Sequence, residues 1–303
     1  MPAPLVTIGI PTYNRSDRLL RAVHSALAQD HPALEVIVSD DASTDSTEAG
    51  MRGLAAREPR LRYLRQERNL GHAGNFQAVL DAAGGDYFMW LSDDDWIDGS
   101  YVSACLAALA ADPGASLVAG LASYYSGGEH VVDERPMELL SPRPGARVLR
   151  YLARVNTNGV LFGVARRADL RKLSFREEVG GDWLLVAGLA AAGRVHTLTG
   201  VHIHRSIDGL SSDRQRLAES LGMSGRLARH HHFAVAGAFA REIASAPAYD
   251  RLGRAHRAVL GALAAALIVV RFPGGLALRA LLRRLGLARL EAVAAAWVRR
   301  RDR

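Results

Sequence analysis

Short apolar runs alternate with helix-like segments over the first hundred residues, and this alternation limits the fold more than any other feature of the chain. Four such runs lie at residues 5–10, 35–39, 61–64 and 87–91. Between the first two, the apolar side chains of residues 16–27 fall on one helical face. Strands that alternate with helices form βαβ units, in which a parallel sheet is covered on both faces. The sequence therefore predicts an α/β domain.

The pattern is less regular in the rest of the chain. We expect helices at 100–111 and 182–191, strands at 117–122 and 160–165, and a loop across 127–147. From residue 214 onward the pattern is helical, with interruptions at Pro247 and at 273–275. We therefore divide the chain into a domain over 1–213, with halves at 1–96 and 97–213, and a helical region over 214–303.

Polar clusters follow three of the predicted strands. Residues 11–15 follow the first strand, Asp40 and Asp41 follow the second, and the aspartates of 93–95 follow the run that ends at Leu91. In open α/β sheets, ligands bind beyond the carboxyl ends of the strands. Five carboxylates at one edge repel one another unless a cation neutralises them, and Mg²⁺ or Mn²⁺ prefers such oxygens while leaving positions for phosphate. The clusters predict a divalent metal that holds a diphosphate and stabilises it as a leaving group.

Each acidic cluster also has a purely structural interpretation. Asp40 and Asp41 precede a run of Ser and Thr and are equally suited to cap a helix. Three aspartates shortly before a helix that begins at Ser100 are also typical of a solvated turn. Because both clusters follow strands of one α/β unit, a shared ligand site explains them better than two unrelated turns.

Four stretches resemble the nucleotide-sugar half of family 2 glycosyltransferases. In order along the chain, they are residues 6–15 (VTIGIPTYNR), 36–45 (VIVSDDASTD), 69–71 (NLG) with Asn75, and 85–95 (GDYFMWLSDDD). The resemblance covers residues 5–96 and implies a GT-A fold, the Rossmann-like fold of nucleotide-diphospho-sugar transferases, here with a C-terminal helical extension. It also implies an inverting transfer of a sugar from a UDP- or dTDP-sugar to a hydroxyl of a glycan, lipid-linked or small-molecule acceptor.

Carried over position by position, the resemblance implies a nucleotide-sugar site. Its residues are Pro11, Thr12, Tyr13, Asn14, Arg15, Asp40, Asp41, Asn69, Gly71, Asn75 and Asp93. One of Asp40 and Asp41 is expected to contact a pyrimidine base, and the sequence leaves open which. The family's usual first aspartate falls on Ser92, so Asp93 is expected at the ribose. Asp94, and next to it Asp95, are then the expected ligands of Mn²⁺ or Mg²⁺.

The same resemblance implies a general base in the second half of the domain. An inverting transfer needs a group that takes the proton of the acceptor hydroxyl as it attacks the anomeric carbon. The stretch 180–185 (GGDWLL) matches the family's helix-opening Glu/X-Asp motif, so Asp182 is the expected base, with Gly181 where Glu is common. An ordinary aspartate in the first turn of a helix is the alternative. Trp183 is expected either to stack on a sugar ring or to pack in the core.

The stretch 202–211 resembles the family loop that closes over the diphosphate. His202 and His204 alternate and so share one face of a strand. His204 or Arg205 is expected to reach the metal or the phosphates, and a buried histidine with satisfied hydrogen bonds is the alternative interpretation.

The net charge of +7 lies at the C-terminus. Residues 271–303 hold nine arginines and two acidic residues, an excess equal to that of the whole chain. Within 278–285 the leucines fall on one helical face and the arginines on the opposite one, as in a helix that lies on an anionic membrane surface. Packing of this helix on the catalytic domain is the equal alternative. Nucleic-acid binding is not expected, because basic and aromatic residues are not interleaved.

Other sequence features limit location and class. Cys105 is the single cysteine, so no intrachain disulfide forms, and the N-terminus has no signal-peptide pattern. The longest uncharged apolar stretch, 258–270, is shorter than the roughly 20 residues of a spanning helix. We expect a cytoplasmic protein, with peripheral attachment to the inner face of the membrane if the C-terminal helices bind lipid.

Two rival functions follow from the same residues. A sugar nucleotidyltransferase is disfavoured because the loop after the first strand lacks a glycine-rich, basic phosphate cradle. A degenerate sugar-nucleotide-binding scaffold is favoured by Ser92 and Gly181, which replace residues common in the family. The oligomeric state is left open by the sequence.

Overall fold

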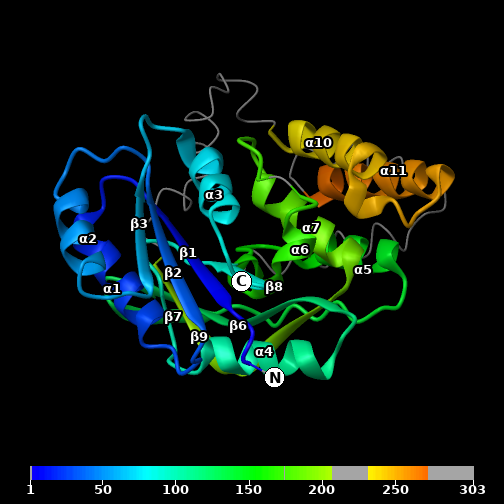
Figure 1. Cartoon of the computed structure of the whole chain (residues 1–303). Coiled ribbons are helices and arrows are strands. Elements are labelled where there is room, and N and C mark those ends of the chain that lie inside the picture. Colours follow the sequence, from blue (N-terminus) through cyan, green and yellow to red (C-terminus); the bar gives the residue numbers. More distant parts are fainter. Residues whose placement is uncertain (1, 174, 207–230, 272–303) are drawn as a thin grey trace.

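The computed structural model describes residues 2–173, 175–206 and 231–271, and its centre is one mixed β-sheet with helices on both faces (Figure 1). The strands are β1 (Val6–Thr12), β2 (Leu34–Asp40), β3 (Leu61–Arg65), β4 (Tyr87–Trp90), β5 (Trp96–Ile97), β6 (Ala115–Ser126), β7 (Glu129–Asp133), β8 (Val164–Arg166) and β9 (Arg194–Ser206). Within these ranges the sheet order is β3-β2-β1-β4-β8-β6-β9-β5, with β7 paired to β6.

The N-terminal half of the sheet is parallel, as the sequence predicts. Strand β1 lies between β2 and β4, with Thr12 opposite Asp40 and Gly9 opposite Trp90. The helices that connect these strands are α1 (Ser16–Leu27), α2 (Thr47–Ala55) and α3 (Gly71–Asp81). Because the strands are covered on both faces, nearly every side chain of β1 and β2 is buried. The carboxyl ends of these strands therefore meet at one edge of the sheet.

The second half makes the sheet mixed. Strand β8 is antiparallel to both β4 and β6, whereas β6 and β9 are parallel. The accompanying helices are α4 (Tyr101–Ala111), α5 (Pro144–Arg154), α6 (Arg167–Leu170) and α7 (Gly181–Ala192). In Figure 1, α3 of the first half and α7 of the second lie on the same side of the sheet, at neighbouring positions.

Two predictions for this half are wrong in detail. Residues 160–165 do not form one strand: the 3₁₀ helix η1 (Gly159–Phe162) comes first, because Asn158 adopts a left-handed backbone conformation that turns the chain before β8. The expected loop 127–147 contains β7 and the start of α5. Gly127 and Gly128, both with positive φ, close the β6–β7 hairpin, and Pro144 stands in the first turn of α5, where its missing N–H has no consequence.

The described C-terminal helices pack on the second half of the domain. They are α10 (His231–Ser245), the short 3₁₀ helix η3 (Pro247–Tyr249) and α11 (Arg254–Arg271), which lie beside α5 and α7 (Figure 1). The guanidinium of Arg271 is buried and donates to the carbonyl oxygens of Leu152 and Val155 at the end of α5. None of the described helices combines the length and apolar content needed to cross a membrane. The expected stripe at 278–285 and the basic residues beyond Arg271 lie outside the described residues, as does 207–230.

Candidate active site

The ends of β1 and β2 are held together by one side chain from α3. Asn75 is buried, and its Nδ2 donates to the carbonyl oxygens of Ser39, at 2.9 Å, and Thr12, at 3.3 Å. Its Oδ1 accepts from the Ser39 hydroxyl at 2.6 Å. Asn75 is an expected nucleotide-site residue, and both ends of its amide are thus hydrogen-bonded to residues at the ends of β1 and β2. It fixes the geometry of the loops that follow.

The loops after β1 and β2 are joined to each other. Asn14 has a positive φ of 53°, and its Oδ1 accepts from the amide of Thr44 at 2.7 Å. Its own amide donates to the hydroxyl of Ser43 at 2.9 Å. Ala42, with φ of 62°, makes the corresponding turn after β2. Of the residues at the end of β1, Pro11 is buried within the strand, and Tyr13, just after the strand, is exposed.

The two aspartates after β2 have different partners. Asp40 accepts from the amide of Ser43 at 2.8 Å and from the hydroxyl of Tyr63. Asp41 accepts from the amide of Leu70 at 2.6 Å, which ties it to the segment that contains Asn69 and Gly71. Burial raises the pKa of Asp41, against the opposing effect of backbone hydrogen bonds from that segment.

The next three aspartates point to three different partners. Asp93 accepts from the hydroxyl of Thr12 at 2.8 Å, and burial raises the pKa of Asp93 to about 6. Asp94 forms an ion pair with Arg15, whose Nη1 lies 2.9 Å from its Oδ2. Asp95 is 1% exposed and forms an ion pair with Arg205, at 2.9 Å between Nε and Oδ2. The sequence places these carboxylates side by side, and the fold separates their roles.

A basic face of α1 covers Asp94. In addition to Arg15, Arg18 lies 3.8 Å from its carboxylate, and Arg21 donates to its carbonyl oxygen at 2.9 Å. The guanidinium of Arg21 also lies 3.7 Å from the centre of the Trp96 ring, in a cation–π contact. Positive charge therefore already surrounds the edge at which a diphosphate is expected.

The donor set permits a divalent cation under one condition. In the described ranges, no cluster of three or more His, Cys, Asp or Glu side chains is arranged to hold a metal ion. The contacts of Asp93 and Asp94 engage one carboxylate oxygen of each, Oδ2 in both cases. Mg²⁺ is commonly bound by one or two carboxylates together with substrate phosphates and water. The residues therefore fit a metal that arrives with, or is completed by, a diphosphate.

Strand β9 sends its side chains to two different regions. The partly buried guanidinium of Arg205 lies over the ring of Phe162, at 4.3 Å from its centre, and Nη1 lies 3.4 Å from the hydroxyl of Tyr124. His202 and His204 share the other face, as predicted, with ring centres 6.0 Å apart. His204 stacks on Trp96, and its Nε2 lies 2.8 Å from Asp98.

His202 is paired as well, since its Nδ1 lies 2.8 Å from the hydroxyl of Ser123. Both histidines thus have hydrogen-bond partners within the protein, on the face of β9 opposite Arg205.

Asp182 lies in the first turn of α7, which begins at Gly181 after the left-handed N-cap residue Gly180. Its Oδ2 accepts from Nδ2 of Asn158 at 2.8 Å. Burial raises the pKa of Asp182, and the hydrogen bond from Asn158 opposes this effect. Trp183 is half-buried, and the guanidinium of Arg271 lies 5.5 Å from its ring centre.

The backbone leaves no room for a side chain at Gly181. A Cβ at this position would lie 2.2 Å from the carbonyl oxygen of Arg176, closer than any real contact. An acidic side chain, Glu177, lies in the segment that precedes α7. Oε2 of Glu177 accepts from the amide of Ala73, in the first turn of α3, at 2.6 Å.

Three residues near Asp182 were missed by sequence reasoning. Asn158 precedes a short 3₁₀ helix, Glu177 lies in an irregular segment, and His72 lies in the first turn of α3. Burial lowers the pKa of His72, whose ring contacts Phe76 and Phe175 at centre distances of 4.3 and 5.7 Å. None of the three belongs to a motif. Glu177 could still be singled out from the sequence, because it is one of two adjacent acidic residues just before a predicted helix.

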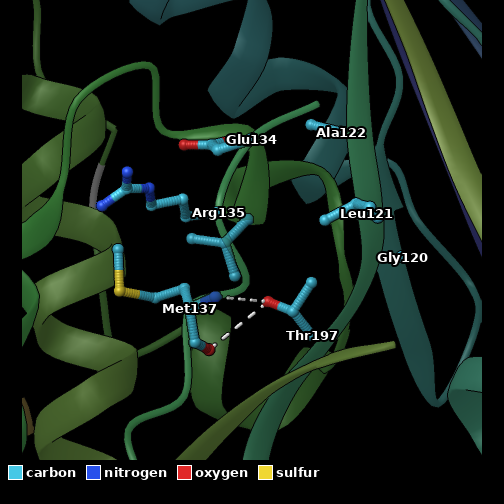
Figure 2. Close-up of a pocket in the computed structure, with 8 residues that line it drawn as sticks. Gly120, Leu121, Ala122, Glu134, Arg135, Met137 and Thr197 are labelled. Atoms are coloured by element: carbon cyan, nitrogen blue, oxygen red, sulfur yellow. Dashed lines mark hydrogen bonds between the residues drawn. The ribbon is translucent and has the colours of Figure 1, made fainter. Parts of the chain in front are cut away.

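A small pocket lies behind this site, between β6, β9 and the segment that follows β7 (Figure 2). Its lining includes Glu134, which accepts from the amide of Gly159 at 2.8 Å. The hydroxyl of Thr197 accepts from the amide of Met137 at 2.9 Å and donates to its carbonyl oxygen at 3.3 Å, and Figure 2 draws both bonds as dashed lines. The enclosed space, about 10 Å³, is about that needed by one water molecule. The pocket is therefore too small to hold a sugar, and its lining residues have a structural role.

Part of the chain matches known proteins in sequence. The family model described as "Glycosyl transferase family 2" matches residues 7–172. A relative from Campylobacter jejuni, GalNAc(5)-diNAcBac-PP-undecaprenol beta-1,3-glucosyltransferase, is 39% identical over 93 residues, which are 30% of this chain and 30% of the relative. The matched part of this chain thus spans less than a third of that protein.

Solved structures with similar folds extend the likeness beyond the matched motifs. A TarS structure from S. aureus in complex with UDP-GlcNAc has a TM-score of 0.58 and 20% identity, and the match covers 88% of this chain and 71% of that one. The mannosyltransferase PcManGT from Pyrobaculum calidifontis, in complex with GDP-Man and Mn²⁺, has a TM-score of 0.55 and 20% identity, with 98% and 86% covered. The GT-A fold predicted from the sequence is confirmed. The chain belongs to glycosyl transferase family 2.

Proposed function

We propose that this chain is an inverting glycosyltransferase that moves a sugar from a nucleotide diphosphate to a hydroxyl of an acceptor. The observation that carries the proposal is the placement of Asp182. Its carboxylate is partly buried, has a raised pKa and accepts a hydrogen bond from Asn158. It lies on the side of the sheet where Glu177, just before α7, bonds to the first turn of α3. A base in this setting can take up the proton of an attacking hydroxyl. In this proposal, the aspartates at the strand ends bind the sugar nucleotide that serves as the donor.

The donor is a UDP- or dTDP-sugar in this proposal, bound over the loops after β1, β2 and β4. Two of the similar solved structures carry the sugar nucleotides UDP-GlcNAc and GDP-Man, which supports the substrate class. Tyr13, Arg15 and Asp93 are proposed to touch the donor. Asp40 and Asn75 act through the loops they hold, since their polar atoms bond within the protein.

Mn²⁺ or Mg²⁺ is the proposed cofactor, with Asp94 as first ligand and Asp93 beside it. When bound, the cation neutralises charge on the departing diphosphate. Asp95 holds Arg205 in place rather than binding the metal, because its carboxylate faces that guanidinium. Arg15 and Arg18 supply further positive charge at the same edge, and Asp182 accepts the acceptor's proton on the opposite face of the sugar.

The acceptor is proposed to be a glycan or a lipid-linked saccharide. The Campylobacter jejuni relative acts, by its name, on an undecaprenol-linked saccharide, which supports this class. Residues 1–96 form the donor half in this proposal, 97–213 the acceptor half and 214–303 a helical region. The basic segment 271–303 is proposed to attach the protein to an anionic membrane on the cytoplasmic side.

A second candidate is a binding protein without turnover. Its support is specific: Ser92 and Gly181 replace the family's usual acids, and Asp94 already forms ion pairs with arginines. Such a protein would bind the sugar nucleotide and leave its glycosidic bond intact.

Hydrolysis of the donor separates these candidates without knowledge of the acceptor, because water replaces the hydroxyl. The full chain is incubated with UDP-GlcNAc, UDP-glucose, UDP-galactose, GDP-mannose or dTDP-rhamnose, with Mn²⁺, Mg²⁺ or EDTA. Release of the nucleotide diphosphate is measured for wild type, Asp94→Asn, Asp182→Asn and the control Asp17→Asn, an exposed residue of α1.

The proposal expects metal-dependent release that falls at least about 100-fold in Asp182→Asn, the scale of a lost general base, while the control stays at wild-type rate. Binding of a sugar nucleotide by calorimetry with no release under any condition would establish the binding protein instead.

A further inference from the structure

Asn158 has an unusual backbone for a buried residue. Its φ and ψ are 57° and 36°, in the left-handed region, and its side chain is 2% exposed. Most residues are strained there, whereas Asn and Gly tolerate the conformation. The turn brings the side chain of Asn158 onto α7, at Asp182. A buried residue keeps this conformation only if its contacts hold it there, and the contacts of Asn158 therefore indicate its role.

The amide of Asn158 is used at both ends. The hydroxyl of Tyr151, a fully buried residue of α5, donates to Oδ1 at 2.8 Å. Nδ2 donates to Oδ2 of Asp182 at 2.8 Å. Because the Tyr151 hydroxyl needs an acceptor at Oδ1, the amide keeps its NH₂ group toward the carboxylate. Three elements, α5, the turn before η1 and α7, thus converge on one carboxylate oxygen.

We propose that Asn158 is a positioning residue for the reaction: it fixes the carboxylate of Asp182 in one orientation and favours its ionised form, and Tyr151 fixes the amide of Asn158. This inference rests on the proposed role of Asp182 as the base. A hydrogen bond from a neutral donor to an ionised acceptor is stronger than one between neutral groups, and it favours the charged form.

Other charged groups around Asp182 do not replace this contact. His72 faces it from α3, but burial lowers the pKa of His72, so at neutral pH the ring carries no charge to stabilise a carboxylate. Glu177 also faces His72, and Glu134 lies behind Gly159. Arg271 reaches this region from α11, where it lies over Trp183 and donates to carbonyl oxygens of α5. Among the described residues, the amide of Asn158 is thus the side-chain group that donates a hydrogen bond to this carboxylate, next to the backbone amides of the first turn of α7.

The test compares variants that keep the fold. Asn158→Gly removes the amide and suits the left-handed backbone, and Asn158→Asp keeps the shape but replaces the donor by an acceptor. Tyr151→Phe frees the amide to rotate. The matched control is Tyr249→Phe, because Tyr249 is equally buried but its hydroxyl has no hydrogen-bond partner among the described residues. Thermal unfolding confirms that each variant is folded.

The readout is the pH dependence of kcat for hydrolysis of the preferred sugar nucleotide. Activity of a base is lost as pH falls through its pKa, so a higher pKa moves the acid limb to higher pH. We expect Asn158→Gly to shift this limb upward by about one unit. The plateau value of kcat above the limb should fall about tenfold, because the carboxylate is no longer held in one orientation, with KM within twofold of wild type. Asn158→Asp shifts it further, Tyr151→Phe shifts it less, and Tyr249→Phe leaves it unchanged.

The outcomes distinguish this inference from the proposed function. If Asp182→Asn abolishes turnover but folded Asn158→Gly has an unshifted acid limb, the inference fails and the base assignment stands. The same holds if Asn158→Gly changes KM alone. If Asp182→Asn turns over at the wild-type rate, the base assignment itself fails, and the positioning role fails with it.

Discussion

Oε2 of Glu177 lies 2.6 Å from the backbone nitrogen of Ala73, and this hydrogen bond joins two halves of the domain that are 104 residues apart in sequence. The amide belongs to the first turn of α3, where backbone N–H groups have no partner inside the helix. The N-cap residue of α3, Leu70, makes no side-chain hydrogen bond to these groups. Glu177 supplies the missing acceptor from the other half of the chain, together with a negative charge that the helix N-terminus favours.

Replacement of Glu177 tests this junction. We expect Glu177→Ala to lower the free energy of unfolding by about 1–2 kcal/mol, because an amide of the α3 first turn loses its charged acceptor. Glu177→Gln keeps an acceptor oxygen and should lose less. The side chain of the neighbouring Glu178 forms a long, partly exposed ion pair with Arg241, at 3.8 Å, so Glu178→Ala is the control and stays near wild type. Equal losses for the two alanine variants in urea unfolding would contradict the assigned role.

The buried ion pair of Arg205 with Asp95 predicts a large effect of one-sided replacement. Arg205→Ala leaves an uncompensated buried carboxylate and should destabilise the fold by about 3–5 kcal/mol. The double variant with Asp95→Ala removes both charges and should recover a substantial part of that loss. Arg52→Ala, which breaks the exposed pair with Glu48, should change stability by less than about 1 kcal/mol. Urea unfolding of these variants measures the coupling, and strict additivity of the two buried replacements would refute it.

Two glycines in helices are expected to respond to alanine in opposite directions. Gly181→Ala forces the carbonyl of Arg176 to move and should cost about 1–3 kcal/mol, as overpacking does. A Cβ at Gly50, inside α2, would meet nothing within 4 Å. Gly50→Ala should therefore stabilise the protein by about 0.5–1 kcal/mol, through the better helix propensity of alanine. Differential scanning calorimetry of the two variants checks both signs.

The single cysteine gives a simple chemical prediction. Cys105 is fully buried in α4, and burial raises the pKa of its thiol to about 12. Because the thiolate is the reactive form, the native protein should not react with a disulfide reagent at pH 8, and one equivalent should react after unfolding. Rapid labelling of the native chain would show that α4 opens without global unfolding.

The sequence predicted those parts of the site that follow strands. Asp40, Asp41 and Asp93 lie at the carboxyl edge of the sheet because parallel strands end together, and apolar runs followed by polar residues reveal strand ends. The helix that carries Asp182 was likewise readable from its apolar pattern. These features depend on neighbours within a few residues, so local sequence is sufficient to find them.

The partners of these side chains were not predictable in the same way. The alternation of β9 correctly separates Arg205 from His204, but it does not say which face meets Asp95 and which meets Asp98. The contact of Glu177 with Ala73 depends on how two halves pack, and so does the meeting of Asn158 with Asp182. Such contacts arise from tertiary structure, and no periodicity in the chain records them.

Among the described residues, the non-glycine positions with positive φ are Asn14, Ala42 and Asn158, and each lies in a loop of the candidate site. For a residue with a Cβ, this conformation costs on the order of 1–2 kcal/mol, less for asparagine. In the described part of the chain, this source of backbone strain is thus concentrated in the loops of the candidate site. Selection for heat resistance and selection for turnover would therefore act on the same three turns, and improvement of one would constrain the other.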